Sequence, residues 1–305
     1  MAEFHRRRGF FFAFVCVFAW FQKKPYLCNT KGGNNPCFQQ YINEKRKMST
    51  VIYPSPIFGP IHSRRLGLSL GINLMPADGK LCSFDCIYCE CGFNAQRIPH
   101  SQRPTRQQVS QALEAQLTQM QTEGRMPDVL TFAGNGEPTM HPHFLQIVED
   151  TIALRDKYCP KAKVSVLTNA TMILRDNVFR ALQLVDNNIL KLDTVDPEYI
   201  YLTNRPNTHY DLPAIIQRMK EFHGHAIIQT MFMHGTFEGV DVGNLSENYL
   251  EPWLKAVKEI APQQVMIYTI DRETPDHELR KALPQELDAI ADRLRDMGFP
   301  TSVGY

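Results

Sequence analysis

The chain has 305 residues, 43% of them hydrophobic, which is enough for one large domain or two modest ones with a full core. Its eight cysteines do not fit the disulfide framework of a small secreted domain, and clustered cysteines in a chain of this size favour metal binding in a reducing compartment. The formal charge of +1 combines a basic stretch, residues 1–48, with an acidic remainder, which argues against a broad phosphate-binding face.

The first 48 residues are predicted to be an extension outside the core. Arg6, Arg7 and Arg8 precede a nearly apolar run at residues 9–21, as in a signal peptide, but no small-residue cleavage site follows. The run is also short for a membrane span, which needs about 20 residues. Either Met48 is the working start or the extension is a signal or anchor. We expect the first, and with it a cytoplasmic protein without stable membrane association.

Residues 49–305 predict a single α/β domain. Apolar runs of strand length alternate with segments of helical periodicity, a pattern typical of parallel βα units. Six units fit a partial (β/α)6 TIM-like barrel with parallel strands, in which the loops at the carboxyl ends of the strands carry the chemistry. The predicted strands are Leu70–Leu74, Val129–Ala133, Val164–Thr168, Ile189–Asp193, Ala226–Met231 and Val265–Thr269.

Two amphipathic helices are predicted from their apolar faces. Thr105 and Asp176 are predicted to cap helix starts, because their side-chain oxygens can accept from backbone N–H groups of a first turn. The apolar faces comprise Val109, Ala112, Leu113, Leu117 and Met120 in the first helix, and Leu287, Ile290, Ala291, Leu294 and Met297 in the second.

Three cysteines, Cys82, Cys86 and Cys89, follow the first predicted strand with the spacing C-x3-C-x2-C. Thiolates are the usual ligands of iron–sulfur clusters, and three of them would leave one iron of a cube open for chemistry. Together with Cys91 they could instead form a four-thiolate zinc site. However, only one residue separates Cys89 from Cys91, which is unlike the usual zinc pairs, so the spacing favours a cluster.

The segment Cys82-Ser-Phe-Asp-Cys86-Ile-Tyr88-Cys89 resembles the radical S-adenosylmethionine (radical SAM) superfamily. This resemblance implies one [4Fe–4S] cluster on the three cysteines, with the open iron binding the amino and carboxylate groups of S-adenosylmethionine. It also implies one-electron cleavage of that cofactor to methionine and a 5′-deoxyadenosyl radical, which takes hydrogen from a substrate carbon. Tyr88, beside the last ligand, could stack on a cofactor ring or pack the loop.

A glycine-rich motif, Gly134-Asn135-Gly136-Glu137, follows the second predicted strand. Glycines let the backbone approach a ligand closely, and Glu137 offers a carboxylate to an ammonium group. The motif resembles the Gly-Gly-Glu element of the superfamily with one inserted residue, which implies binding of the methionyl amino group. An ordinary strand-to-helix turn is the alternative.

Polar residues at later strand ends complete the predicted cofactor site. In similar enzymes these strand ends contact the ribose and the methionyl carboxylate, so the resemblance assigns Thr168 and Asn169 to the cofactor. Lys191 could neutralise a carboxylate and Asp193 could accept from ribose hydroxyls, and strict alternation places both on one strand face. The alternative is a structural ion pair. Weaker candidates of the same kind are Gln229 and Tyr268.

The substrate is not predicted, and it could be a small molecule, a protein or RNA. Arginines suit phosphate or carboxylate recognition, but loop arginines are more often solvated. A proton-donor role is conceivable for two histidines near the glycine motif, although filling a turn fits them better. The candidates are His62, Arg64, Arg65, residues 203–206, His141 and His143.

Residues 56–275 resemble a group of stand-alone radical enzymes related to wyosine-base synthases, which modify a guanine in transfer RNA. Those synthases hold a second cluster on three cysteines just before the triad, whereas Cys16, Cys28 and Cys37 come far earlier here. A wyosine-like reaction and glycyl-radical activation remain alternatives, as does an iron–sulfur protein that only transfers electrons or senses redox state. The enzyme interpretation requires an electron donor, such as a reductase or a flavodoxin- or ferredoxin-type protein.

Overall fold

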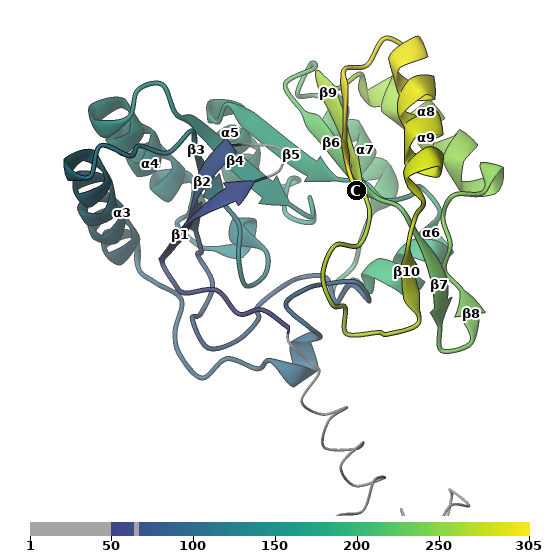
Figure 1. Ribbon diagram of the computed structural model, residues 1–305, viewed down its shortest axis with the longest axis horizontal. Helices are drawn as coiled ribbons and strands as arrows, with labels where there is room; N and C mark the ends of the chain where they lie inside the picture. Colours follow the sequence, from purple (N-terminus) through teal and green to yellow (C-terminus); the bar gives the residue numbers. More distant parts are fainter. Residues whose placement is uncertain (1–49, 64–66) are drawn as a thin grey trace, which may run out of the picture. The chain divides into compact units, whose positions relative to one another are not determined.

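The computed structural model describes residues 50–63 and 67–305, whose centre is a curved eight-stranded sheet that forms a partial barrel (Figure 1). The predicted extension at residues 1–48 and the candidates Arg64 and Arg65 lie outside the described residues. The edge strand β1 (Ile57–Ser63) is antiparallel to β2. From β2 onward the strands are parallel, in the order β2 (Gly67–Ile72), β3 (Val129–Phe132), β4 (Lys163–Thr168), β5 (Asn187–Lys191), β6 (Ile227–Met231), β9 (Gln264–Tyr268) and β11 (Thr301–Gly304).

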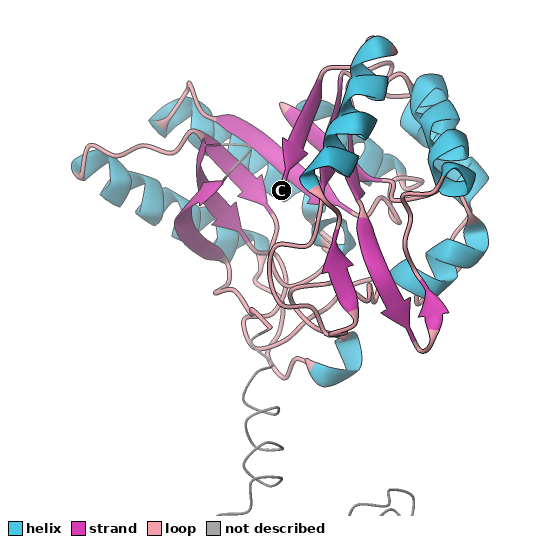
Figure 2. Ribbon diagram, turned by 45° about the vertical axis from the view of Figure 1, so that its right-hand side comes forward, coloured by secondary structure: helices cyan, strands magenta, loops and turns pink. Residues whose placement is uncertain are grey.

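A helix follows each of six parallel strands, and these helices lie along the outer side of the curved sheet (Figures 1 and 2). These are the helical crossover connections that join neighbouring parallel strands. The described residues therefore contain six βα units and a further parallel strand. The helices are α3 (Arg106–Thr122), α4 (Phe144–Tyr158), α5 (Asp176–Leu184), α7 (Leu212–Lys220), α8 (Glu247–Ile260) and α9 (Pro284–Asp296).

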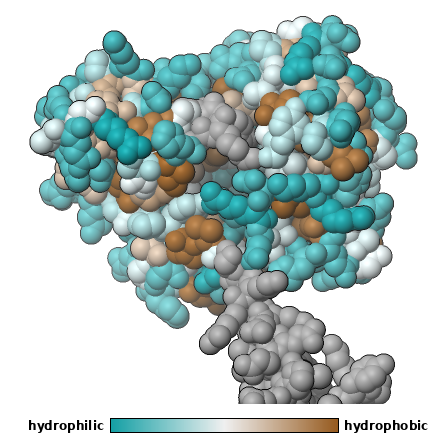
Figure 3. Space-filling view, in the orientation of Figure 1, coloured by the Kyte–Doolittle hydropathy of each residue, from teal (hydrophilic) through white to brown (hydrophobic). Residues whose placement is uncertain are grey.

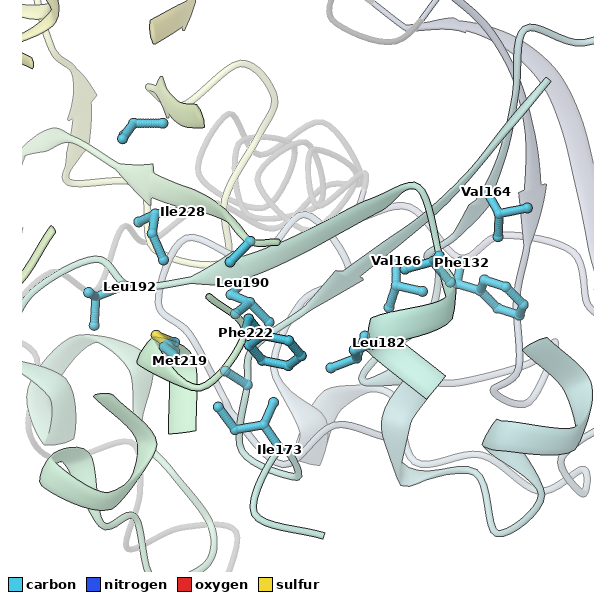
Figure 4. Close-up of a cluster of buried hydrophobic side chains, with 14 of the residues drawn as sticks. Phe132, Val164, Val166, Ile173, Leu182, Leu190, Leu192, Met219, Phe222 and Ile228 are labelled. Carbon is cyan, nitrogen blue, oxygen red and sulfur yellow. The ribbon is translucent and has the colours of Figure 1, made fainter. Parts of the chain in front are cut away.

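The main hydrophobic core lies between the sheet and these helices. Figure 4 shows Val166 of β4 and Leu190 of β5 near Leu182 of α5 and Met219 of α7, and all four side chains are inaccessible to solvent. Alternation along each strand sends one set of side chains into this core and the other set into the barrel. Inside the barrel a small apolar cluster, made of Ile189, Ile227, Met266 and Leu167, packs below the polar residues of the strand ends.

A smaller sheet lies beside the carboxyl ends of the barrel strands. It consists of β7 (Met233–Phe237) between β8 (Val240–Asp241) and β10 (Leu279–Lys281), all antiparallel (Figure 1). Its buried residues, among them Met233, Phe237 and Leu279, belong to one apolar cluster with the loop that carries the three cysteines, residues 82–89 (the cysteine loop). The sheet therefore supplies part of the wall that surrounds the three cysteines.

All six predicted strands are present, and the predicted partial (β/α)6 barrel is confirmed. Strands outside this prediction are β1, whose Gly59-Pro60 pair conceals an extended segment, the three strands of the smaller sheet, and β11. The last of these lies almost at the carboxyl terminus, where Ser302, Val303 and Gly304 pair with β9. A strand as short as β11 is hard to recognise because four residues show little periodicity.

One of the two predicted caps is correct. Thr105 accepts a hydrogen bond from Gln108 N (3.2 Å), and Gln108 Oε1 accepts from Thr105 N (2.8 Å), which together form a capping box at α3. Asp176 is not a cap, because the N-cap of α5 is Arg175 and no side chain bonds there. Asp176 instead accepts from Arg218 at 2.9 Å, so its carboxylate faces α7.

On the face shown in Figure 3 the described residues are mostly hydrophilic, with smaller hydrophobic patches among them. Exposed large apolar side chains include Ile98 and Leu283. Within the described residues, no helix is both long and apolar enough to cross a membrane.

Replacing Thr105 tests the capping box. Thr105→Ala removes the side-chain acceptor of the first turn and should lower the free energy of unfolding by about 1 kcal/mol, measured by denaturant titration. Thr105→Ser keeps the hydroxyl and should stay close to the parent protein. Equal losses in the two variants would mean that the methyl group, rather than the cap, stabilises α3.

Candidate functional site

A cavity of about 460 Å³ opens at the carboxyl ends of the parallel strands. This is the location where barrels of this kind carry their chemistry. Most of the predicted site residues line the same cavity, although they come from loops and strand ends far apart in the sequence: Cys82, Cys86, Tyr88, Cys89, Gly134, Gly136, Glu137, Thr168, Asn169, Lys191, Gln229 and Tyr268.

The cysteine loop is held from the outside by the segment at residues 203–207. Asp85 N donates to Asn204 O (2.9 Å), Ile87 N donates to Thr203 O (3.0 Å), and Asn207 N donates to Ser83 O (3.0 Å). These hydrogen bonds fix the backbone of the residues that lie between the cysteines. Residues 203–206, which the sequence offered as candidates for substrate contact, thus support the cysteine loop.

Apolar side chains surround the three thiols. Phe84, Ile87 and Tyr88 of the loop pack with Met231 and Met233 in one buried cluster. Burial raises the pKa of the Cys82 thiol and raises that of Cys86 to about 11. The neighbouring Cys91 and the ammonium of Lys80 outweigh burial at Cys89 and lower its pKa to about 6.

The described residues do not form the four-thiolate site of the zinc alternative. Within residues 50–63 and 67–305, no three His, Cys, Asp or Glu side chains converge as a single metal ion requires. A cube makes no such demand, because its cysteine ligands bind separate irons. Cys91 does not line the cavity; its thiol is buried and donates to Gly134 O at 3.6 Å.

Glu137 presents a fixed carboxylate to the cavity, and only 2% of the residue is exposed. Its Oε1 accepts from Thr139 Oγ1 (2.6 Å), Thr139 N (3.0 Å) and Thr168 Oγ1 (2.7 Å), while Oε2 accepts from Asn169 N (2.7 Å). Burial nevertheless outweighs these bonds and raises the pKa of Glu137. A cationic ligand would therefore stabilise this carboxylate, because the groups that bond it, Thr139, Thr168 and Asn169, carry no charge.

The glycine motif brings the backbone of two loops together. Gly136 adopts a φ of 136°, and a Cβ there would lie 1.9 Å from Leu81 O. This close approach lets Leu81 N donate to Asn135 O (2.9 Å) and Glu137 N donate to Leu81 O (3.2 Å). The residue before Cys82 is thus bonded directly to the segment that carries Glu137.

A buried polar network lies behind Tyr88. Asp193 Oδ2 accepts from the Tyr88 hydroxyl and from Asn204 Nδ2 (3.0 Å), and Asp193 Oδ1 accepts from Met231 N (2.9 Å). Lys191 Nζ lies 3.2 Å from Asp193 and 3.0 Å from Tyr88 Oη. Burial disfavours the Lys191 ammonium, but Asp193 outweighs it and raises the Lys191 pKa.

Two predicted cofactor contacts do not line the cavity. The Asn135 side chain is fully buried and bonds the backbone of Tyr53 and Pro76. Asp193 is bound by the network behind Tyr88, so its carboxylate faces other protein groups. Lys191 and Asp193 do share one face, as strict alternation predicts, and they form an ion pair.

The sequence comparison identifies the family to which these features belong. The model of the Radical SAM superfamily matches residues 78–245, which is more than half of the chain and includes the cysteine triad and Glu137. The chain belongs to the radical SAM superfamily. Its class is therefore that of enzymes that cleave S-adenosylmethionine by a radical mechanism, with an iron–sulfur cluster and a reductant.

The sequence is also similar to that of individual proteins from other organisms. A UPF0026 protein of Helicobacter pylori is 29% identical over 72% of this chain and 67% of its own length. A UPF0026 protein of Methanocaldococcus jannaschii is 33% identical over 58% of this chain and 53% of its own length. The second match therefore spans only about half of that relative.

Among solved structures, a radical SAM methyltransferase from Sphaerobacter thermophilus has a similar fold. Its TM-score is 0.58 at 14% identity, over 77% of this chain and 65% of that one. At this identity the likeness concerns the fold alone.

Several residues of this cavity and its surroundings were not predicted from the sequence. Lys80 lines the cavity two positions before Cys82, and Asn204 donates to Tyr88 Oη at 2.7 Å from a segment 116 residues away. Two earlier candidates are placed differently: His62 lines the cavity from β1, whereas the buried His141 bonds Pro104 O outside it. His143 lies beside His141, also outside the cavity. A π-helix over residues 200–204 positions Asn204, and no pattern in the sequence predicts this helix.

Substitution of Gly136 tests the close approach of the two loops. Gly136→Ala would place a methyl group against Leu81 O, so iron and sulfide content after anaerobic reconstitution should fall severalfold. Gly124→Ala is the matched control, because Gly124 also has a positive φ (68°) but a Cβ added there would meet no atom within 4 Å. Equal cluster content in the two variants would contradict this role of Gly136.

Proposed function

We propose that this chain is a radical SAM enzyme that cleaves S-adenosylmethionine at a single [4Fe–4S] cluster held by Cys82, Cys86 and Cys89. The observation that carries the proposal is that three thiols and the buried carboxylate of Glu137 face one cavity. Residues 49–305 would form the catalytic domain. The reaction would be hydrogen abstraction from a substrate whose identity the site does not disclose.

The donor set fits both groups. Thiolates in an apolar shell suit an iron–sulfur cube, and Glu137 suits the ammonium of the methionyl end. Gly134 and Gly136 bring backbone close to that end, while Thr168, Asn169, Gln229 and Tyr268 supply polar groups along the wall. When bound, the cluster supplies the electron that cleaves S-adenosylmethionine to methionine and a 5′-deoxyadenosyl radical.

Residues around the cavity would bind and orient the cofactor and shield the reacting centre from water. Lys191 reaches the cavity with its charge balanced by Asp193, so it would donate a hydrogen bond to a cofactor carboxylate. Phe84, Met231 and Ile270 keep water from the reacting centre, which protects reactive species from side reactions. Asn135 and Asp193 would act from behind this wall by holding the glycine turn and Tyr88.

The free cysteines of the described residues agree with a reducing compartment and a single cluster. Outside the triad, the described residues include only Cys91 and Cys159, too few for a second cube. This supports one cluster rather than the two of wyosine-base synthases. We propose a cytoplasmic enzyme that receives electrons from a reductase or a flavodoxin- or ferredoxin-type donor.

Product analysis tests the proposed activity. The full chain, reconstituted with iron and sulfide without oxygen and reduced with dithionite, should convert S-adenosylmethionine to 5′-deoxyadenosine, measured by chromatography. A Cys82→Ala, Cys86→Ala, Cys89→Ala variant should form neither the cluster nor the product. A parent protein that binds the cluster but releases no 5′-deoxyadenosine under several reductants would point to electron transfer or redox sensing instead.

The affinity for S-adenosylmethionine should depend on Glu137. Glu137→Gln removes the charge and should weaken binding by tenfold or more in calorimetry while retaining the visible absorption of the cluster. In the parent, binding should weaken as pH falls through the raised pKa of Glu137, because protonation removes the carboxylate charge. A pH profile shared by the parent and Glu137→Gln would rule out Glu137 as the titrating group.

A further inference from the structure

Lys80 is a buried cation with incomplete compensation by the protein. Its side chain is 1% exposed, and Nζ donates to Gly92 O at 2.7 Å. The nearest carboxylate, Asp85 Oδ1, lies at 3.5 Å and already accepts from Asn94 N at 2.7 Å. Buried charges are normally paired closely or bound to a ligand, so this ammonium calls for additional negative charge.

Lys191, whose side chain lines the same cavity and is 15% exposed, shows what full compensation looks like. Lys191 lies 3.2 Å from Asp193, whose side chain is 2% exposed, and it also donates to Tyr88 Oη. That pair is neutral as a unit. Lys80 has only the longer contact to Asp85, whose side chain is 18% exposed and therefore partly screened by solvent.

The proposed cluster would supply negative charge close to Lys80, in the cavity that Lys80 lines. Lys80 lines the cavity together with Cys82, Cys86 and Cys89, within range of the charge that thiolates there would carry. Three thiolates around a cube leave a net negative charge, which grows by one unit when the cluster accepts an electron. In an apolar surrounding such as the Phe84 and Ile87 cluster, a fixed cation favours the more negative state.

We propose that Lys80 is the charge-compensating residue of the cluster and raises its reduction potential into the range of the electron donor. The inference rests on the proposed cluster site. One electron passes from a flavodoxin- or ferredoxin-type donor, which is oxidised by one electron, to the cluster, and Lys80 stabilises the added charge without changing its own protonation. Its hydrogen bond to Gly92 O holds the ammonium in place.

A redox titration of reconstituted protein, followed by electron paramagnetic resonance, tests this role. Lys80→Gln keeps a donor for Gly92 O but removes the charge, so the equilibrium constant for one-electron reduction should fall roughly tenfold to a hundredfold, or about 60–120 mV. Lys80→Arg keeps the charge and should remain close to the parent. Lys163→Gln, an exposed lysine at the amino end of β4, controls for a general loss of charge.

The outcomes separate charge from structure. A Lys80→Gln variant with the parental potential would overturn the proposal, as would failure of both Lys80→Gln and Lys80→Arg to assemble a cluster. Assembly in Lys80→Arg but not in Lys80→Gln would support it, because only the charge is then required. A shifted potential in a protein that never cleaves S-adenosylmethionine would refute the proposed function and leave the role of Lys80 standing.

Discussion

Two backbone hydrogen bonds, between Leu81 and the glycine turn, hold the site together. They join the residue before Cys82 to Asn135 and Glu137, so the loop of the three cysteines and the Glu137 carboxylate form one unit. The contact exists because Gly136 has no Cβ to separate the two backbone segments. The proposed cluster and cofactor would need this fixed relation, because an error of an ångström would separate their ligands.

Burial of charge is the second constraint. The cavity wall contains the carboxylate of Glu137, the Lys191–Asp193 pair and the ammonium of Lys80, all largely removed from water. The pair is balanced within the protein, whereas the bonds given for Glu137 come from hydroxyl and backbone N–H groups and Lys80 has only the longer contact to Asp85. Their placement is complementary to the proposed ligands, since an ammonium would face Glu137 and an anionic cluster would face Lys80.

Much of the fold and part of the site could be predicted from neighbouring residues. Strand cores such as 129–133 and 164–168 are mainly apolar and rich in Val and Leu, and the cysteine spacing lies within eight residues. Other features could not be predicted. Asn204 contacts Tyr88 across 116 residues, and β1 is interrupted by Pro60, so neither leaves a local pattern. Asp176 shows the same limit, because its partner Arg218 belongs to another helix.

By itself the sequence determined the order of the βα units and the residue types that can bind a cluster and an ammonium, because periodicity and motif spacing are properties of adjacent residues. Only the tertiary structure decided which of these groups share a cavity. It turned Asn135 and Asp193 toward the protein, set the segment 203–207 against the cysteine loop, and buried Lys80 beside the thiols. Burial and hydrogen-bond partners arise from packing between distant segments, and that packing is what converts a cysteine motif into a charged, water-poor site.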